Sequence, residues 1–175
     1  MKVVAFGAST HKTSINKALA TYVAGLIDGA EVKVLDINDY ELPLYTQDRE
    51  EELGSPEQAK QFLADIASAD ALVISFAEHN GHYPAAYKSL FDWASRTNRE
   101  VYAHKPAVYL STSPGPGGAK SVLGAAVASA EFFAGNVKAS VSVPNFYDVF
   151  DVEAGKVTDD AVNAELKEAV AKLTA

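Results

Sequence analysis

The chain has 175 residues, of which 48% are hydrophobic and 22% are charged, a balance typical of one globular domain rather than of a disordered chain. It contains no cysteine, which excludes disulfides, iron–sulfur ligation and thiol catalysis. Fifteen basic against 23 acidic residues give a net charge of −8, which argues against nucleic acid and anionic membranes as principal partners. The apolar runs are too short to span a membrane or to form a signal peptide, so we expect a cytoplasmic protein.

Five β-rich runs alternate with helix-length segments. The runs are Lys2–Phe6, Glu31–Asp36, Ala71–Phe76, Pro106–Ser111 and Val137–Val143. The first, third and fourth are almost continuously apolar, as expected for parallel strands that are covered on both faces. The alternation predicts a three-layer, doubly wound α/β fold with helices on both faces of the sheet. Five parallel strands favour the flavodoxin-like order 2-1-3-4-5, in a single domain over residues 1–175.

Helical spacing and turn residues predict the segments between the strands. The expected helices cover residues 15–27, 55–69, 84–95, 118–133 and 159–173. Two long stretches, Asn38–Gly54 and Pro144–Thr158, follow neither periodicity and are expected to be irregular. Because compact domains rarely keep such long loops without a use, both are candidates for a functional role.

In an open α/β sheet, ligands bind outside the carboxyl ends of the strands, where the strand order reverses. The first loop there, Gly7–Asn16, is rich in hydroxyl groups and leads directly into a helix, whose N-terminus attracts anions. His11, Lys12 and Lys17 add local positive charge, so the loop favours a phosphate. The simpler interpretation is a helix capped by Ser14 with solvated polar residues before it. The loop lacks both glycine-rich nucleotide motifs, and His11 replaces the last glycine of a nucleophile elbow.

Two further loops reach the same edge of the sheet. In the second, Asn80-Gly81 indicates a tight turn where backbone can approach a ligand closely. Glu78, His79 and His82 could instead hold a metal ion, but their spacing is weakly diagnostic. The third loop, Ser111–Gly118, contains enough proline and glycine to form a shaped turn against a flat ligand, or else a plain strand-to-helix connection.

Three segments together resemble the NADPH-dependent FMN reductase family, which includes azoreductases, quinone reductases and chromate reductases. Ala8–Ala20 is similar to the family pattern G-S-x-R-x-x-S-x-N-x-x-L-A. Ala77–Pro84, with Lys88, Asp92 and Trp93, is similar to P-E-Y-N-G-S-x-P-x-x-x-K-x-x-x-D-W. The Ser111–Gly118 loop is the third match.

The resemblance implies FMN as cofactor, with NADPH or NADH as co-substrate. Ser9, Ser14 and Asn16 would hold the phosphate, Glu78, Asn80 and Gly81 would line one edge of the isoalloxazine, and Ser113 and Gly115 would close its far side. The implied cofactor-binding residues are Ser9, His11, Ser14, Ile15, Asn16, Ala77, Glu78, His79, Asn80, Gly81, Ser113 and Gly115. No catalytic side chain is implied, because the flavin carries the chemistry.

Three positions depart from the family pattern. His11 stands in place of its arginine, so the phosphate clamp is weaker or borne by Lys12. His79 and Ala77 stand in place of its tyrosine and proline, which changes the surface offered to the ring.

The implied activity is hydride transfer from a nicotinamide to the flavin and on to a quinone, an azo compound, free flavin or a similar small acceptor, in a homodimer or homotetramer. One alternative is a flavodoxin-like electron carrier without nicotinamide activity, and another is a regulatory protein that has lost the flavin. The aromatic segment Pro144–Phe150 either covers its own core or packs across a dimer interface.

Overall fold

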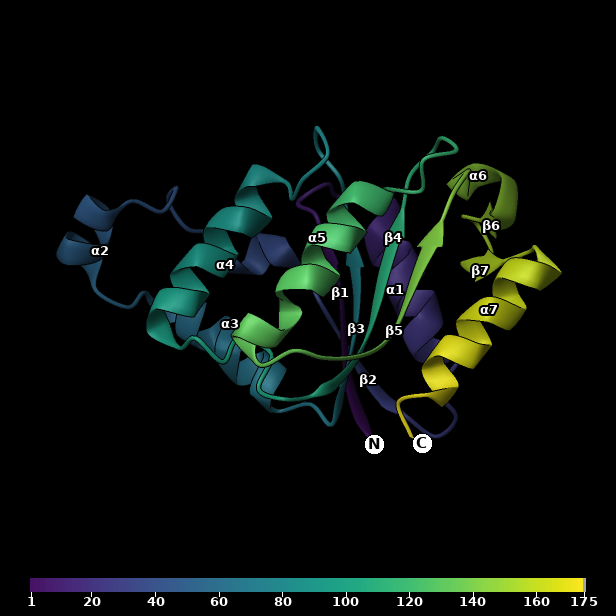
Figure 1. Ribbon diagram of the computed structural model, residues 1–175, viewed down its shortest axis with the longest axis horizontal. Coiled ribbons are helices and arrows are strands. Elements are labelled where there is room, and N and C mark those ends of the chain that lie inside the picture. The colour runs from purple at the N-terminus through teal and green to yellow at the C-terminus, as the bar shows by residue number, and fades with distance from the viewer. Residues whose placement is uncertain (175) are drawn as a thin grey trace.

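A five-stranded parallel sheet forms the middle layer of the molecule (Figure 1). The structure is a computed structural model and describes residues 1–174. The strands are β1 (Lys2–Ala8), β2 (Glu31–Leu35), β3 (Ala71–Phe76), β4 (Pro106–Thr112) and β5 (Asn136–Val143). Their order, β2-β1-β3-β4-β5, confirms the predicted flavodoxin-like topology.

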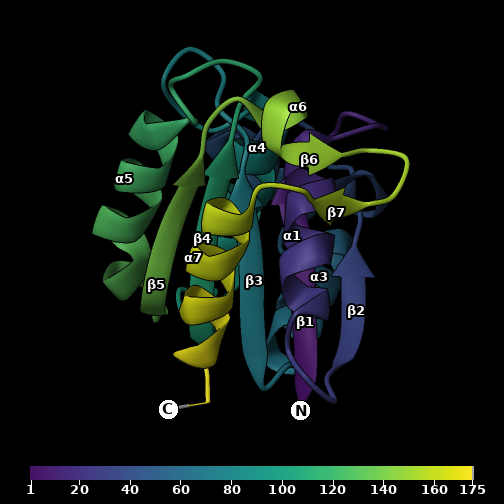
Figure 2. The same ribbon diagram turned by 90° about the vertical axis from the view of Figure 1, so that its right-hand side faces the viewer.

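Helices cover both faces of this sheet. The longer ones are α1 (Ile15–Gly25), α3 (Glu57–Ala67), α4 (Ala85–Thr97), α5 (Lys120–Ala130), which continues into η2 (Glu131–Phe133), and α7 (Asp160–Ala171). Helices α1 and α7 pack on one face, and α3, α4 and α5 pack on the other (Figure 2). No helix within residues 1–174 has both the length and the apolar character needed to cross a membrane.

Each central strand contributes to two hydrophobic cores. In β1, Val4 and Phe6 enter the core under α3 and α4, whereas Val3 and Ala5 enter the core under α1 and α7. All four side chains are at most 2% exposed. Alternate side chains of a strand point to opposite faces, so a strand covered on both sides has no polar face. This explains why the central strands are almost continuously apolar in the sequence.

The two stretches expected to be irregular contain short elements. The first holds η1 (Ile37–Tyr40) and α2 (Gln47–Leu53), the latter lying away from the sheet at one end of the molecule (Figure 1). No residue of α2 is buried, so no apolar periodicity marks it. Its helical conformation is favoured by Thr46, whose hydroxyl accepts a hydrogen bond from the Arg49 amide, and by acidic residues in the first turn.

The second stretch holds α6 (Phe146–Val149) and an antiparallel pair, β6 (Phe150–Asp151) and β7 (Lys156–Val157). Phe146 and Phe150 are 0% and 4% exposed, and their rings stack with centroids 4.6 Å apart. Both therefore cover the core of their own chain, whereas the packing of this segment across a dimer interface stays a prediction. Tyr147, between them, is 62% exposed.

Candidate functional site

The first loop packs tightly on the helix that follows it. Gly7 lies so close to the first turn of α1 that a Cβ atom there would be 2.4 Å from the Lys17 backbone nitrogen. Ser14 is the N-cap of α1, and its hydroxyl accepts a hydrogen bond from that nitrogen at 3.2 Å. The N-terminal end of α1, with its unpaired N–H groups, is thereby held at the carboxyl end of β1.

Polar contacts within the loop order the residues before Ser14. The Ser9 hydroxyl accepts a hydrogen bond from the His11 amide at 3.2 Å, and the Thr13 hydroxyl lies 3.3 Å from His11 Nδ1. His11 and Thr13 are exposed, whereas Ser9 is half-buried. The loop therefore presents hydroxyl and imidazole groups to solvent beside a helix N-terminus, an arrangement suited to an anion.

The positive charge of this loop is smaller than the sequence suggests. Lys17 Nζ lies 2.6 Å from Asp36 Oδ2, at the start of η1. That hydrogen bond, and a second from the Asn38 amide, hold the pKa of Asp36 below its usual range. Lys17 is thus largely neutralised, and Lys12 and His11 are the cationic or titratable groups left near the α1 terminus.

Asn16 joins three elements beneath the loops. Its side chain is 4% exposed, its Nδ2 donates to the Thr112 carbonyl at 3.3 Å, and its Oδ1 accepts from the Ser75 hydroxyl at 2.7 Å. Oδ1 also accepts from the Thr112 amide at 3.2 Å. The amide group thus connects α1 to the carboxyl ends of β3 and β4.

The second loop is a two-residue turn. The His79 and His82 backbones exchange hydrogen bonds of 2.9 and 3.2 Å. Asn80 and Gly81 between them have φ values of 54° and 85°, the left-handed conformations that this kind of tight turn requires. The predicted Asn-Gly turn is confirmed.

The Glu78 side chain reaches the start of α5. Its Oε2 accepts a hydrogen bond of 2.9 Å from the Val122 backbone N–H, in the first turn of α5. Within residues 1–174, no group of three or more histidine, aspartate or glutamate side chains is arranged to hold a metal ion.

The third loop is anchored at its far end. Gly118 has a φ of 59°, and its carbonyl accepts hydrogen bonds from the Ser111 and Ser142 hydroxyls. A Cβ on Gly118 would lie 2.3 Å from Ser142 Oγ. These contacts hold the loop against β4 and β5.

The three loops surround a cavity of about 270 Å³. Nine of the twelve predicted cofactor-binding residues line it: Ser9, His11, Ser14, Ile15, Asn16, Ala77, Glu78, His79 and Ser113. Asn80, Gly81 and Gly115 belong to the same loops but do not line the cavity. Four further lining residues are absent from the predicted set: Thr13, Thr112, Pro114 and Tyr147.

Of those four residues, Tyr147 is the one that lies outside the three loops predicted to form the site. Thr13, Thr112 and Pro114 belong to the loops already singled out. Tyr147 comes from the aromatic segment after β5, and its exposure sets it apart from the buried Phe146 and Phe150. The signal was present in the sequence as an aromatic run, but the run did not show which ring faces the site.

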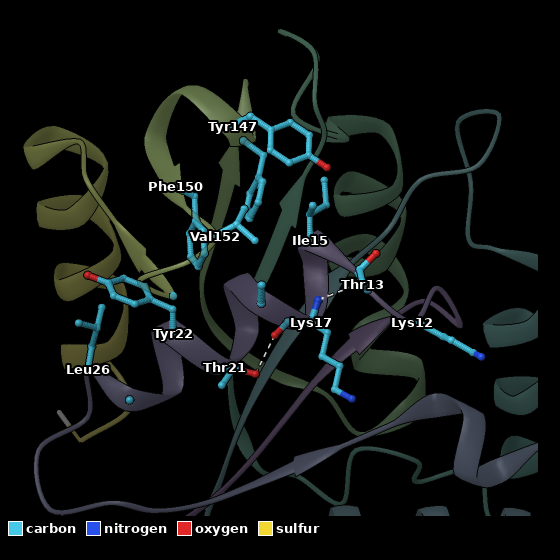
Figure 3. Close-up of a pocket in the computed structure, with 15 residues that line it drawn as sticks. Lys12, Thr13, Ile15, Lys17, Thr21, Tyr22, Leu26, Tyr147, Phe150 and Val152 are labelled. Atoms are coloured by element: carbon cyan, nitrogen blue, oxygen red, sulfur yellow. Dashed lines mark hydrogen bonds between the residues drawn. The ribbon is translucent and has the colours of Figure 1, made fainter.

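A larger groove of about 810 Å³ adjoins this cavity (Figure 3). It runs along α1 toward the β6–β7 pair, with Tyr22, Leu26, Phe150 and Val152 among its apolar walls. The two cavities share Thr13, Ser14, Ile15 and Tyr147. Volume alone does not locate the site, because the groove lies beside α1 and receives neither the second nor the third loop.

A comparison with known proteins places the chain in a family. The family model for NADPH-dependent FMN reductase matches residues 1–148. A 2-hydroxy-1,4-benzoquinone reductase of a Burkholderia species is 36% identical over 117 residues, covering 66% of this chain and 62% of that protein. An NAD(P)H-dependent FMN reductase of Pseudomonas aeruginosa is 33% identical over 116 residues, covering 66% and 61%. The chain thus spans about three-fifths of the length of these curated relatives.

Solved structures agree on the fold. The flavoenzyme NAD(P)H:(acceptor) oxidoreductase FerB of Paracoccus denitrificans superposes with a TM-score of 0.74 and 26% identity, over 99% of this chain and 95% of that one. An FMN-dependent NADH-azoreductase of Bacillus anthracis gives a TM-score of 0.65 at 14% identity over the whole of both chains, which is a likeness of fold alone. With its sheet order, its three loops and a family match over residues 1–148, the chain belongs to the NADPH-dependent FMN reductase family.

Proposed function

We propose that this protein is an FMN-dependent NAD(P)H oxidoreductase that delivers electrons to a small acceptor such as a quinone, an azo compound or free flavin. The observation that carries this proposal is the single cavity in which the N-terminus of α1, with Ser9 and Ser14, meets the turn-forming loop after β3. A helix N-terminus suits a phosphate, and exposed backbone at a glycine turn suits the edge of a flat ring.

The residues of the three loops divide into two groups by position. Ser9, Ser14 and the backbone N–H groups that open α1 would hold the phosphate of FMN. Backbone from Glu78 to Gly81 would border one edge of the isoalloxazine, with Ser113 and Gly115 opposite. The lining fits the anionic phosphate of FMN. Its one carboxylate, on Glu78, is directed to α5, where it accepts a hydrogen bond from the Val122 N–H.

Asn16 would support the site rather than contact the phosphate. Both polar atoms of its amide are engaged by Ser75 and Thr112. Its contribution is to hold the start of α1 against the strand ends, so that the phosphate donors and the ring-binding loops keep a constant separation.

The protein's own role in the reaction is binding and exclusion of water, since FMN, when bound, supplies hydride acceptance from the nicotinamide and electron delivery to the acceptor. The His79 and His82 N–H groups are engaged within the turn, so the N–H groups of Asn80 and Gly81 would be the ones to stabilise negative charge near the ring edge. Tyr147, which lines the cavity and is 62% exposed, would cover bound cofactor from the solvent side.

The chain is further proposed to form a homodimer or homotetramer. Leu44, just before α2, and Leu53, its last residue, are 62% and 53% exposed. They offer apolar surface for a second copy. Light scattering on the wild type and on a Leu44→Asp, Leu53→Asp variant tests this, and a monomeric wild type overturns it.

A visible spectrum of the purified protein after incubation with FMN and desalting tests the activity. We expect retained flavin absorbance that NADPH or NADH bleaches without oxygen and that a quinone then restores. Retained flavin that neither nicotinamide bleaches would identify an electron carrier instead. Loss of all flavin on desalting would contradict a tightly bound cofactor.

A further inference from the structure

Helix α5 begins without a cap of its own. Its N-cap residue, Ala119, has a left-handed backbone (φ 56°) and no side chain that can accept a hydrogen bond. The first N–H groups of a helix have no partner within the helix, and a side-chain acceptor usually satisfies one of them. An acceptor for these groups comes either from water or from another part of the chain.

Glu78 provides that acceptor from the second loop. It lies 44 residues before Val122, and its Oε2 is 2.9 Å from the Val122 backbone nitrogen. An ionised carboxylate is favourable at the positive end of the helix dipole, and hydrogen bonds to charged acceptors are stronger than neutral ones. The contact therefore caps α5 and also attaches the second loop to it.

Through α5, this contact connects the second loop to the third, and the two loops differ in how they are held. The third loop is anchored on the β5 side: the Asn145 amide donates to the Gly115 carbonyl at 2.9 Å, and the Phe146 amide donates to the Ser113 carbonyl at 3.1 Å. The turn of the second loop is closed by hydrogen bonds between His79 and His82, within itself. The Glu78 side chain connects this closed turn to the helix that the third loop leads into.

We propose that Glu78 is a positioning residue, whose carboxylate sets the separation between the second and third loops by capping α5. This rests on the proposed function for the identity of the ligand, since the isoalloxazine would lie between those two loops. The backbone of Glu78 borders the ring edge, while its side chain points to α5 and keeps that backbone in place.

Hydrogen exchange on the protein without FMN tests the attachment. Glu78→Ala should accelerate exchange by about tenfold both in residues 77–84 and in the first turn of α5, the effect expected for losing about 1.4 kcal/mol of local stability. Glu78→Gln keeps an acceptor oxygen and should stay within about threefold of the wild type. Ala128→Gly, at an exposed position within α5, weakens the helix without touching the loop and should accelerate exchange in α5 alone.

Two results would overturn the attachment: unchanged exchange in residues 77–84 of Glu78→Ala, or equal acceleration there in Ala128→Gly. FMN titration followed by flavin fluorescence then tests the consequence. We expect about tenfold weaker binding for Glu78→Ala, and changes within about twofold for Glu78→Gln and Ala128→Gly. Unchanged FMN affinity in Glu78→Ala would refute the positioning role. If the wild type itself binds no FMN, the proposed function fails, whereas the exchange result still decides whether Glu78 holds the loop.

Discussion

Asn16 and Thr112 hydrogen-bond to each other in both directions, because the side-chain amide of Asn16 donates to the Thr112 carbonyl and accepts from the Thr112 amide. A neighbouring strand would make the same pair of hydrogen bonds with the backbone of the last residue of β4. The amide thus extends the hydrogen bonding of β4 into α1, and its additional contact with the Ser75 hydroxyl includes β3. The cluster lies where the first loop ends, at Asn16, and where the second and third loops leave β3 and β4.

Asn16→Ala should lower the free energy of unfolding by about 3 kcal/mol. The change leaves the buried Ser75 hydroxyl and Thr112 backbone groups without partners, each worth roughly 1–3 kcal/mol when unsatisfied. Urea unfolding measures the effect. Ser75→Ala should cost about 1 kcal/mol, and the double variant should cost less than the sum of the two, because they share a hydrogen bond. Strict additivity would show that the two side chains act independently.

The sheet order could be predicted from the sequence, whereas the contacts that shape the site could not. Burial on both faces makes β1, β3 and β4 apolar along their length, so a local pattern reveals them. Contacts such as Asn16–Thr112 and Glu78–Val122 join residues 96 and 44 positions apart, and no local pattern marks either partner. Helix α2 was missed for a related reason, since it buries nothing and depends on its cap.

Gly7 is expected to be essential for the position of the first loop. An alanine Cβ would meet the Lys17 backbone nitrogen, which belongs to a helix and cannot move aside, so we expect Gly7→Ala to cost about 3 kcal/mol. Gly25→Ala is the matched control: it is the same substitution in α1, the helix that Gly7 packs against, and an added Cβ there meets nothing within 4 Å. It should stabilise the protein by about 0.5–1 kcal/mol. Thermal unfolding of both variants measures the difference, and similar losses in both would contradict the packing argument.

A buried carboxylate near β2 predicts how stability depends on pH. Asp65 accepts hydrogen bonds from Lys33 Nζ and from the Tyr40 hydroxyl, both at 2.6 Å, and its side chain is 9% exposed. Burial alone would raise the pKa of Asp65, but the hydrogen bonds from Lys33 and Tyr40 outweigh it and the pKa is lowered. The native state therefore favours the ionised form more than the unfolded chain does.

The stabilisation from Asp65 is complete above the unfolded pKa of about 3.9 and is lost as the pH falls through the lower, folded value. Asp65→Asn should cost about 2 kcal/mol at pH 6.5, and the difference from the wild type should shrink at pH 3. Urea unfolding at both pH values measures this. Asp92→Asn, in the more exposed pair with Lys88, should cost less than about 0.5 kcal/mol at either pH. A gap between Asp65→Asn and wild type that is equal at both pH values would show that the charge is not the cause.

His11→Arg should strengthen FMN binding by about three- to tenfold. The residue lies in the first loop, lines the cavity and stands where the family pattern has an arginine. A guanidinium is charged at every accessible pH and can form paired hydrogen bonds with a phosphate, which an imidazole cannot. His104→Arg adds the same charge at an exposed residue just before β4, at the opposite edge of the sheet, and should leave the affinity unchanged. Fluorescence titration with FMN at low and high salt measures both variants. The gain at position 11 should diminish with salt, since the site is exposed, and an equal gain in both variants would indicate net charge rather than a phosphate contact.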